Sequence, residues 1–232
     1  MGRHFQTEMD QINSDLFSLF GHVEKMIHLA VQALCERRPE MVDTVIEMDA
    51  YVDLKEVAIE EEGLKILALH QPVATDLRRI STILKIINDL ERIADLACNI
   101  AERSRDLHFN FPYFPSPEVI PDMATNAVEM VRSALDAFAN QDAELAKDVI
   151  KLDAEVDRLN REAIESLVET MKDSPELVEP SLHCFSAVRH IERIGDHAEN
   201  IAEDVVYLID GEIVRHKHGE FFLSDSKKTE QQ

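Results

Sequence analysis

The sequence predicts an all-α protein built from two tandem, pseudo-symmetric three-helix bundles, with six long antiparallel helices. Composition is the first indication: of 232 residues, 45% are hydrophobic and 30% are charged, with 6 glycines and no tryptophan. A chain poor in glycine and rich in Leu, Ala, Glu, Met, Ile and Val is typical of helices rather than sheets. The placement of the prolines and an internal repeat are the other two indications.

Prolines divide the chain into helical stretches. Single prolines lie at Pro39, Pro72 and Pro175, and a cluster lies at Pro112, Pro115, Pro117 and Pro121. Proline lacks a backbone donor and disrupts helix interiors, so it indicates first turns and connections. The sequence therefore predicts helices at roughly 5–37, 39–69, 72–106, 118–140, 142–172 and 175–210.

The hydrophobic pattern supports these helices. In the second stretch, apolar residues recur every seven positions at Val45, Val52, Ile59 and Ile66. In the third stretch, a spacing of three and four residues runs through Ile80, Ile83, Leu84, Ile87 and Leu90. This spacing places the side chains on one helix face. Long helices with short connections pack as antiparallel bundles.

The two halves of the chain repeat. Residues 47–53 match residues 151–157 at an offset of 104, and residues 91–102 match residues 192–203 at an offset of 101. Nine of the twelve positions in the second pair of segments are identical, which generic helix composition would rarely produce. We therefore expect a first bundle at 1–107, a Pro-rich connector at 108–121, a second bundle at 122–213 and a polar, partly disordered tail at 214–232.

Charge and cysteine content exclude several classes of function. The formal net charge of −22 disfavours nucleic acid and anionic lipid as partners, because both are bound largely through Lys and Arg. No stretch approaches the roughly 18 apolar residues of a transmembrane helix. The three isolated cysteines predict no disulfide framework and indicate a reducing, cytoplasmic location.

Acidic residues four positions apart recur in both repeats. They form the pairs Asp49/Asp53, Glu91/Asp95, Asp153/Asp157 and Glu192/Asp196. Residues at this spacing lie on one helix face, about 5–6 Å apart, where like charges repel and a hard cation reverses the sign of the interaction. Each predicted bundle has one pair on its second helix and one on its third, so antiparallel packing is expected to bring four carboxylates together.

Three interpretations of these pairs stay open. The acidic positions continue the apolar seams of their helices, so their charges require compensation. A bound metal ion is one way, and a network with the repeated Arg92 and Arg193 is another. Plain solvation on an acidic surface is the third.

The sequence contains no motif that indicates an enzyme. It has no Gly-rich phosphate-binding loop, no G-x-S-x-G and no H-E-x-x-H. No Glu is followed three residues later by His, which excludes the ligand pattern of ferritin-like di-iron sites.

Two segments resemble the PhoU family of phosphate-uptake regulators. EVAIEEEGLKILALHQPVATDLRRISTILKIINDLERIADLACNIAE, residues 56–102, is similar to the central PhoU segment, and AVRHIERIGDHAENIAE, residues 187–203, to its second copy. The Glu-Arg-Ile-Gly-Asp block is the most specific part, and the first copy departs from it at Ala94. The resemblance covers roughly residues 8–215.

The resemblance implies a function. PhoU proteins are cytoplasmic, commonly dimeric, non-enzymatic negative regulators of the phosphate-starvation response. They link the ATPase subunit of the phosphate ABC transporter to a sensor histidine kinase at the inner face of the membrane. A metal-binding or metal-storing helical protein without a role in phosphate signalling is the alternative.

The resemblance also implies metal sites at the repeated E/D-x-x-x-D motifs, with iron, zinc, magnesium or manganese as the ion. The matching positions are Asp49, Asp53, Glu91, Asp95, Asp153, Asp157, Glu192 and Asp196. Weaker additions, one or two turns along the same helices, are Glu102, Glu199 and Glu203.

Overall fold

The computed structural model describes residues 3–211 and 213 and confirms the all-α fold class. The helices are α1 (Arg3–Cys35), α2 (Val42–His70), α3 (Ala74–Asn110), α4 (Ile120–Asn140), α5 (Ala143–Asp173) and α6 (Val178–Asp210). Short 3-10 turns at Pro39–Met41 and Pro175–Leu177 lead into α2 and α6. Within this described part of the chain there is no β-strand, and the tail expected at 214–232 lies outside it.

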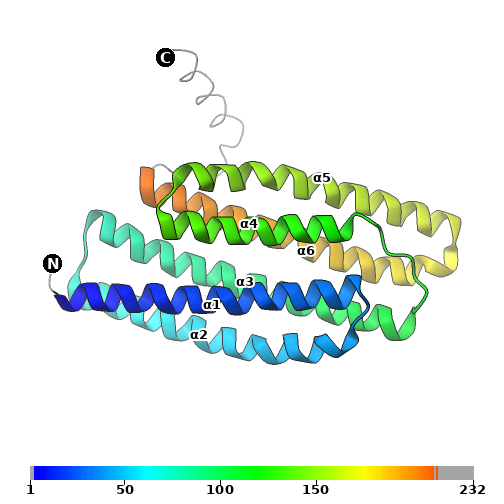
Figure 1. Ribbon diagram of the computed structural model, residues 1–232, viewed down its shortest axis with the longest axis horizontal. Coiled ribbons are helices and arrows are strands. Elements are labelled where there is room, and N and C mark those ends of the chain that lie inside the picture. The colour runs from blue at the N-terminus through cyan, green and yellow to red at the C-terminus, as the bar shows by residue number, and fades with distance from the viewer. Residues whose placement is uncertain (1–2, 212, 214–232) are drawn as a thin grey trace, which may run out of the picture.

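The six helices form two three-helix bundles that lie side by side. Figure 1 shows α1, α2 and α3 in one bundle and α4, α5 and α6 in the other, with their long axes roughly parallel. The last helices of the two bundles, α3 and α6, pack against each other along the middle of the molecule. The connection from α3 to α4 crosses between the bundles at one end (Figure 1).

Local chemistry explains where the helices begin and end. Pro39 and Pro175 occupy the first positions of the two 3-10 turns, where the missing N–H costs little. Asp142 caps α5, because its side chain accepts hydrogen bonds of 3.0 Å from the backbone N–H groups of Glu144 and Leu145. Gln141 ends α4 in the left-handed conformation, with φ of 52°.

The connector is shorter than the sequence predicts. Helix α3 continues to Asn110 and α4 begins at Ile120, so the non-helical connection covers 111–119. Arg37, just after α1, donates hydrogen bonds from its guanidinium group to the backbone carbonyls of Pro112 and Phe114. The end of the first helix therefore holds the connector in place.

The predicted hydrophobic faces form the core. All four residues of the seven-residue pattern in α2, from Val45 to Ile66, are buried. In α3, Ile80, Ile83, Ile87 and Leu90 are fully buried, at 0% exposure, and Leu84 packs against the core from its edge. The periodic apolar residues thus point into the bundles as expected.

Polar contacts join the two bundles across α3 and α6. His197 lies 2.9 Å from Asp89, and Lys85 forms a 2.9 Å ion pair with Asp204. The Asp204 side chain is almost completely buried, so its ion pair fixes the relative position of α3 and α6.

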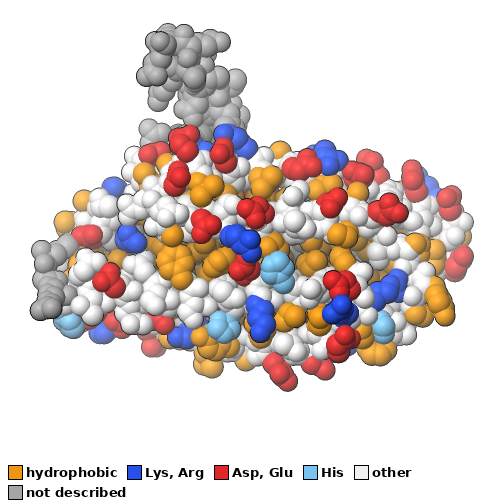
Figure 2. Space-filling view, in the orientation of Figure 1, with side chains coloured by type: hydrophobic (Ala, Val, Ile, Leu, Met, Phe, Trp, Pro, Cys, Tyr) orange, Lys and Arg blue, Asp and Glu red, His pale blue; other side chains and the backbone are white. Residues whose placement is uncertain are grey.

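None of the helices in the described residues is long and apolar enough to cross a membrane. Figure 2 shows acidic side chains dispersed over the visible face, which is consistent with the large negative charge of the chain.

Candidate functional site

The first acidic cluster lies between α2 and α3. Asp49 and Asp53 come from α2, and Glu91 and Asp95 come from α3. Burial raises the pKa of Asp49, and the negative charges of Asp53 and Asp95 raise it further. Burial likewise raises the pKa of Glu91, with Asp95 as the largest charge contribution and Asp53 also contributing. The carboxylates of the two helices therefore repel one another across the gap.

Two further residues, which were not predicted as ligands from the sequence, belong to this cluster. Glu56 lies one turn before Glu60 on α2, and its pKa is raised by burial and by the charges of Glu60 and Asp53. The Cys98 thiol on α3 lies 3.8 Å from the Val45 carbonyl oxygen. Burial and the negative charge of Asp49 raise the pKa of Cys98 to about 12, so the thiol is protonated at neutral pH.

Glu102 is at the edge of the first cluster. Its side chain is exposed, and it contributes to the cluster through its charge on Cys98. The alignment of the repeats at an offset of 101 pairs Cys98 with Glu199, and this pairing is the sequence signal that indicates Cys98 as a position of the first cluster.

The second acidic cluster lies between α5 and α6. Asp153 and Asp157 come from α5, and α6 contributes Glu192, Asp196, Glu199 and Glu203. Burial raises the pKa of Glu199 to about 8, and Asp153 and Glu203 are the largest charge contributions. Burial also raises the pKa of Glu192, with Asp196 as the next cause and Asp157 on α5 a smaller one.

Several members of the second cluster are deeply buried. Glu192 is 8% exposed and Glu203 is 6% exposed. One carboxylate oxygen of Glu192, Oε2, is buried without a hydrogen-bond partner. A buried oxygen of this kind is costly unless a cation or a donor compensates it.

The arginines near both clusters pair with carboxylates on their own helices. Arg92 lies 3.4 Å from Glu91 and 3.3 Å from Asp95, all on α3. On α6, Arg189 forms a 2.6 Å ion pair with Glu192. Pairs within one helix do not by themselves hold two helices in register, as the arginine-network interpretation requires.

Arg193, the second arginine of the proposed arginine network, does not pair with the carboxylates of the second cluster. Arg193 is exposed and forms no ion pair among the described residues, and Arg189 takes the place expected for it beside Glu192. Arg161 pairs with Asp157 at 3.3 Å, again along a single helix.

The donor set of both clusters suits a cation that prefers oxygen ligands. Several carboxylates of like charge are held close together from two helices, and bringing oxygens to one point is what hard cations require. In the part of the chain that the structure describes, no three His, Cys, Asp or Glu side chains are arranged with the spacing of a formed metal site. Metal binding at these residues therefore stays a prediction.

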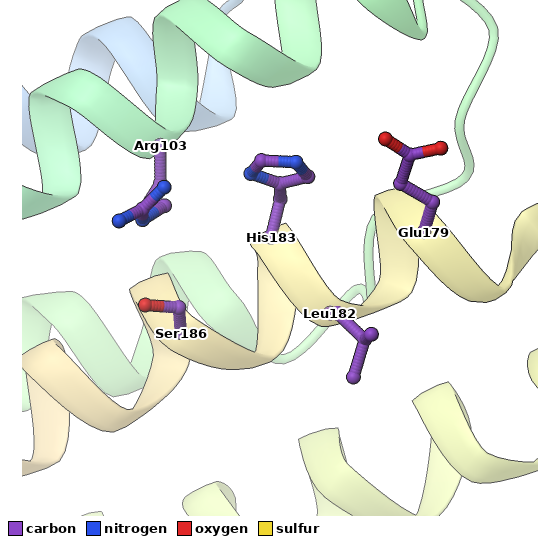
Figure 3. Close-up of a pocket in the computed structure, with 5 residues that line it drawn as sticks. All are labelled: Arg103, Glu179, Leu182, His183 and Ser186. Atoms are coloured by element: carbon purple, nitrogen blue, oxygen red, sulfur yellow. The ribbon is translucent and has the colours of Figure 1, made fainter.

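A separate cavity of about 250 Å³ lies between α3 and the beginning of α6. Figure 3 shows Arg103 reaching from α3 towards His183 and Ser186 of α6, while Leu182 points away. Asp106 lies 3.2 Å from Arg103 and 3.5 Å from His183, so it compensates both side chains. This arrangement serves as a polar contact between the bundles.

The chain matches the model of the PhoU domain twice, at residues 16–104 and 120–205. These two ranges fall on the two bundles, so the family match contains the same duplication as the sequence and the fold.

Known relatives match over nearly the full length. The chain is 39% identical over 216 residues to the phosphate-specific transport system accessory protein PhoU homolog of Pseudomonas aeruginosa, covering 93% of this chain and 89% of the relative. It is 31% identical to the PhoU protein of Escherichia coli over the same shares of the two chains.

Two crystal structures share the fold. PhoU from Pseudomonas aeruginosa superimposes with a TM-score of 0.85 at 39% identity, covering 90% of this chain and 100% of the other. The phosphate transport system regulatory protein PhoU from Streptococcus pneumoniae gives a TM-score of 0.84 at 28% identity, with 90% and 99% covered.

Proposed function

The chain belongs to the PhoU family, and from this premise we propose that it is a non-enzymatic accessory protein of phosphate transport. The observation that carries the proposal is the double family match over both bundles, together with relatives named as phosphate-specific transport system accessory proteins. The sequence agrees, because it contains no Gly-rich phosphate-binding loop, no G-x-S-x-G, no H-E-x-x-H and no Glu-x-x-His.

The finer part of the proposal concerns mechanism. The protein acts in the cytoplasm as a negative regulator of phosphate uptake and of the phosphate-starvation response. It works by occupancy, as an adaptor that binds the ATPase subunit of the phosphate ABC transporter and a sensor histidine kinase, and it forms a homodimer. Regulation by binding requires surfaces and a stable framework, which two long bundles supply.

Metal binding at the two clusters is part of the same proposal. The residues that would hold ions are Asp49, Asp53, Glu91, Asp95 and Glu102 in the first bundle and Asp153, Asp157, Glu192, Asp196, Glu199 and Glu203 in the second. A divalent or trivalent ion, such as iron, zinc, magnesium or manganese, would neutralise the repulsion between the paired helices. The unpartnered oxygen of Glu192 supports the second cluster most strongly.

A complementation experiment tests the regulatory function. A strain that lacks its own PhoU protein is supplied with this chain, and phosphate uptake and a phosphate-starvation reporter are measured in phosphate-rich medium. We expect uptake to fall and the reporter to be repressed. Purified protein is tested in parallel for binding to the transporter ATPase and to the kinase, and binding to neither would overturn the adaptor mechanism.

Paired substitutions separate regulation from metal storage. Glu91→Gln with Asp95→Asn removes two carboxylates from the first cluster, and Glu192→Gln with Asp196→Asn removes their counterparts. Regulation that depends on bound metal predicts a deregulated reporter together with lost metal in elemental analysis. Lost metal with unchanged regulation would instead support the metal-storing alternative.

A further inference from the structure

The outward face of α2 carries an apolar seam. Ile46, Leu54, Val57 and Leu64 are exposed at 37%, 73%, 49% and 53%, and the exposed residues Ala50 and Ala68 extend the row. We call these six residues the α2 seam. From Ala50 to Ala68, with Glu61 between Val57 and Leu64, the spacing alternates between four and three residues, as in the contact line of a coiled coil, and Ile46 lies one further turn before Ala50.

The duplicated unit provides an internal comparison for this face. At the offset of 104 that relates α2 to α5, Leu54, Val57 and Ala68 correspond to Arg158, Arg161 and Lys172. The two helices occupy the same place in their bundles. At these three seam positions α5 presents cations to solvent, whereas the other three, Ile46, Ala50 and Leu64, correspond to the apolar residues Ile150, Ala154 and Val168.

The α5 counterpart is a solvated helix face. Arg158 forms ion pairs of 2.7 Å with Glu155 and 2.8 Å with Glu162 on the same helix. Because α5 forms with cations at three of the six equivalent positions, the bundle does not need Leu54, Val57 and Ala68 to be apolar. Contact with another molecule, rather than the fold, therefore explains the exposed apolar side chains of Leu54 and Val57 at the centre of the seam.

Acidic residues border the α2 seam. Glu47, Asp53 and Glu60 are exposed beside it, and the exposed Glu61 lies within the row, between Val57 and Leu64. Lys65, an exposed cationic residue on the same side of α2, forms a 2.9 Å ion pair with Glu62. Figure 2 shows hydrophobic and acidic side chains side by side along the lower rim of the molecule, where α2 runs.

We propose that the α2 seam docks an amphipathic helix of a partner protein whose apolar stripe is flanked by Lys and Arg. The heptad-like spacing selects a helix, because a second helix with the same spacing packs its apolar side chains between those of the seam. The acidic border selects cationic flanks. The inference rests on the proposed function in one respect, since it gives the adaptor a surface for one of its partners.

The charge of the surface disfavours two other occupants. A second copy of this chain would bring two acidic borders together, and the chain already has a net charge of −22. An anionic lipid surface would be repelled by the same carboxylates.

A binding experiment with synthetic helices tests the proposal. The probe is a labelled peptide of about three heptads with Leu at the contact positions and Lys at the flanking positions. A second peptide has Glu at the flanking positions. Fluorescence anisotropy with the full chain is measured at about 0.15 M salt, where weak long-range attraction is screened. We expect the Lys-flanked peptide to bind and the Glu-flanked peptide not to bind.

Two double variants locate the binding surface. Leu54→Arg with Val57→Arg copies the residues of α5 onto α2 and is expected to weaken binding of the Lys-flanked peptide by at least about tenfold. Val178→Arg with Leu182→Arg adds the same charge at exposed apolar residues of α6 and should leave affinity within about twofold. Circular dichroism checks that both variants keep the helical content and melting temperature of the original chain.

Defined results would overturn the proposal. Equal weakening by both double variants would mean that the peptide responds to net charge alone. Sedimentation in which Leu54→Arg with Val57→Arg turns a dimer into monomers would assign the seam to a second copy of this chain. Binding of the seam to anionic vesicles, lost in that variant, would assign it to a membrane. None of these assays measures phosphate regulation, so failure here is distinguishable from failure of the proposed function.

Discussion

The two acidic clusters have the same spacing in the sequence and different surroundings in the molecule. In the first bundle Glu91 is half-buried and Glu102 is exposed, whereas their counterparts Glu192 and Glu203 are buried. The first cluster has a protonated thiol at Cys98, where the second has the carboxyl group of Glu199. The second cluster therefore concentrates more carboxyl groups in a less hydrated place.

A repeated sequence motif therefore does not imply two sites of equal burial and charge. Burial strengthens the repulsion between neighbouring carboxylates. It also strengthens the attraction between these carboxylates and a cation bound among them. We expect the second cluster to bind a metal ion more tightly and to depend more on pH than the first. Substitutions at equivalent positions can test the comparison directly.

The largest expected effect is on metal-linked stability. At a free metal concentration of about 100 times Kd, each occupied site adds about 2.7 kcal/mol to the free energy of unfolding. Asp153→Asn with Glu199→Gln should remove the larger share of this gain, and Asp49→Asn with Glu91→Gln the smaller share. Urea unfolding with manganese or zinc, and after chelator treatment, measures both.

The sign of the change in metal-free protein sharpens this test. Without metal, and at a pH above about 8 where Glu199 is ionised, the same substitutions relieve repulsion between carboxylates, so they should stabilise the chelator-treated protein. Unfolding that is indifferent to chelator, with no metal in elemental analysis, would rule out metal sites at both clusters.

A smaller effect concerns the pH dependence of stability. Glu199 has a pKa of about 8 in the folded protein, well above that of an unfolded glutamate. Between these two values the folded state holds a proton that the unfolded state has released, so stability falls as pH rises from about 5 to 8. In chelator-treated protein, Glu199→Gln should make the free energy of unfolding depend less steeply on pH, by the amount that corresponds to about one proton.

The equivalent position in the first bundle provides the control. Burial and the charge of Asp49 raise the pKa of Cys98 to about 12, so this thiol does not titrate across the same range. Cys98→Ser should therefore leave the slope unchanged. An equal slope in the original chain and in Glu199→Gln, from urea unfolding at several pH values, would contradict the assignment.

The smallest effect concerns the residue inside the repeated motif. A Cβ atom at Gly195 would lie 3.4 Å from Val156 and 3.6 Å from Asp153, which is ordinary contact. Since alanine stabilises a helix interior by up to about 1 kcal/mol over glycine, Gly195→Ala should raise stability by about 0.5 kcal/mol. Ala94→Gly, at the equivalent buried position, should lower it by about 1 kcal/mol.

Urea unfolding of both variants gives these values. A Gly195→Ala variant that is clearly destabilised would mean that α5 approaches α6 more closely at Asp153 than the contact distances indicate. The reciprocal result, an unaffected Ala94→Gly, would mean that helix propensity has little weight in the first bundle.

Sequence reasoning succeeded where the signal is local. The heptad pattern from Val45 to Ile66 depends on helix periodicity alone, and each of its residues is buried. The C-terminal end of α3 was harder to predict from the sequence. Residues 107–110 contain no proline, and they continue the helix into the expected connector. Glu56 and Cys98 were not included among the ligands, since their environment depends on the neighbouring helix.

The sequence by itself determined the six helices, the duplication, the family and the spacing that puts carboxylates on one face of each helix. These follow from interactions within a few residues of one another or from direct comparison of sequences. The tertiary structure decided which carboxylates face each other, how deeply they are buried and which face of α2 remains uncovered. The physical reason is that spacing fixes only the direction of a side chain around its own helix, whereas charge compensation and burial depend on the helices packed beside it.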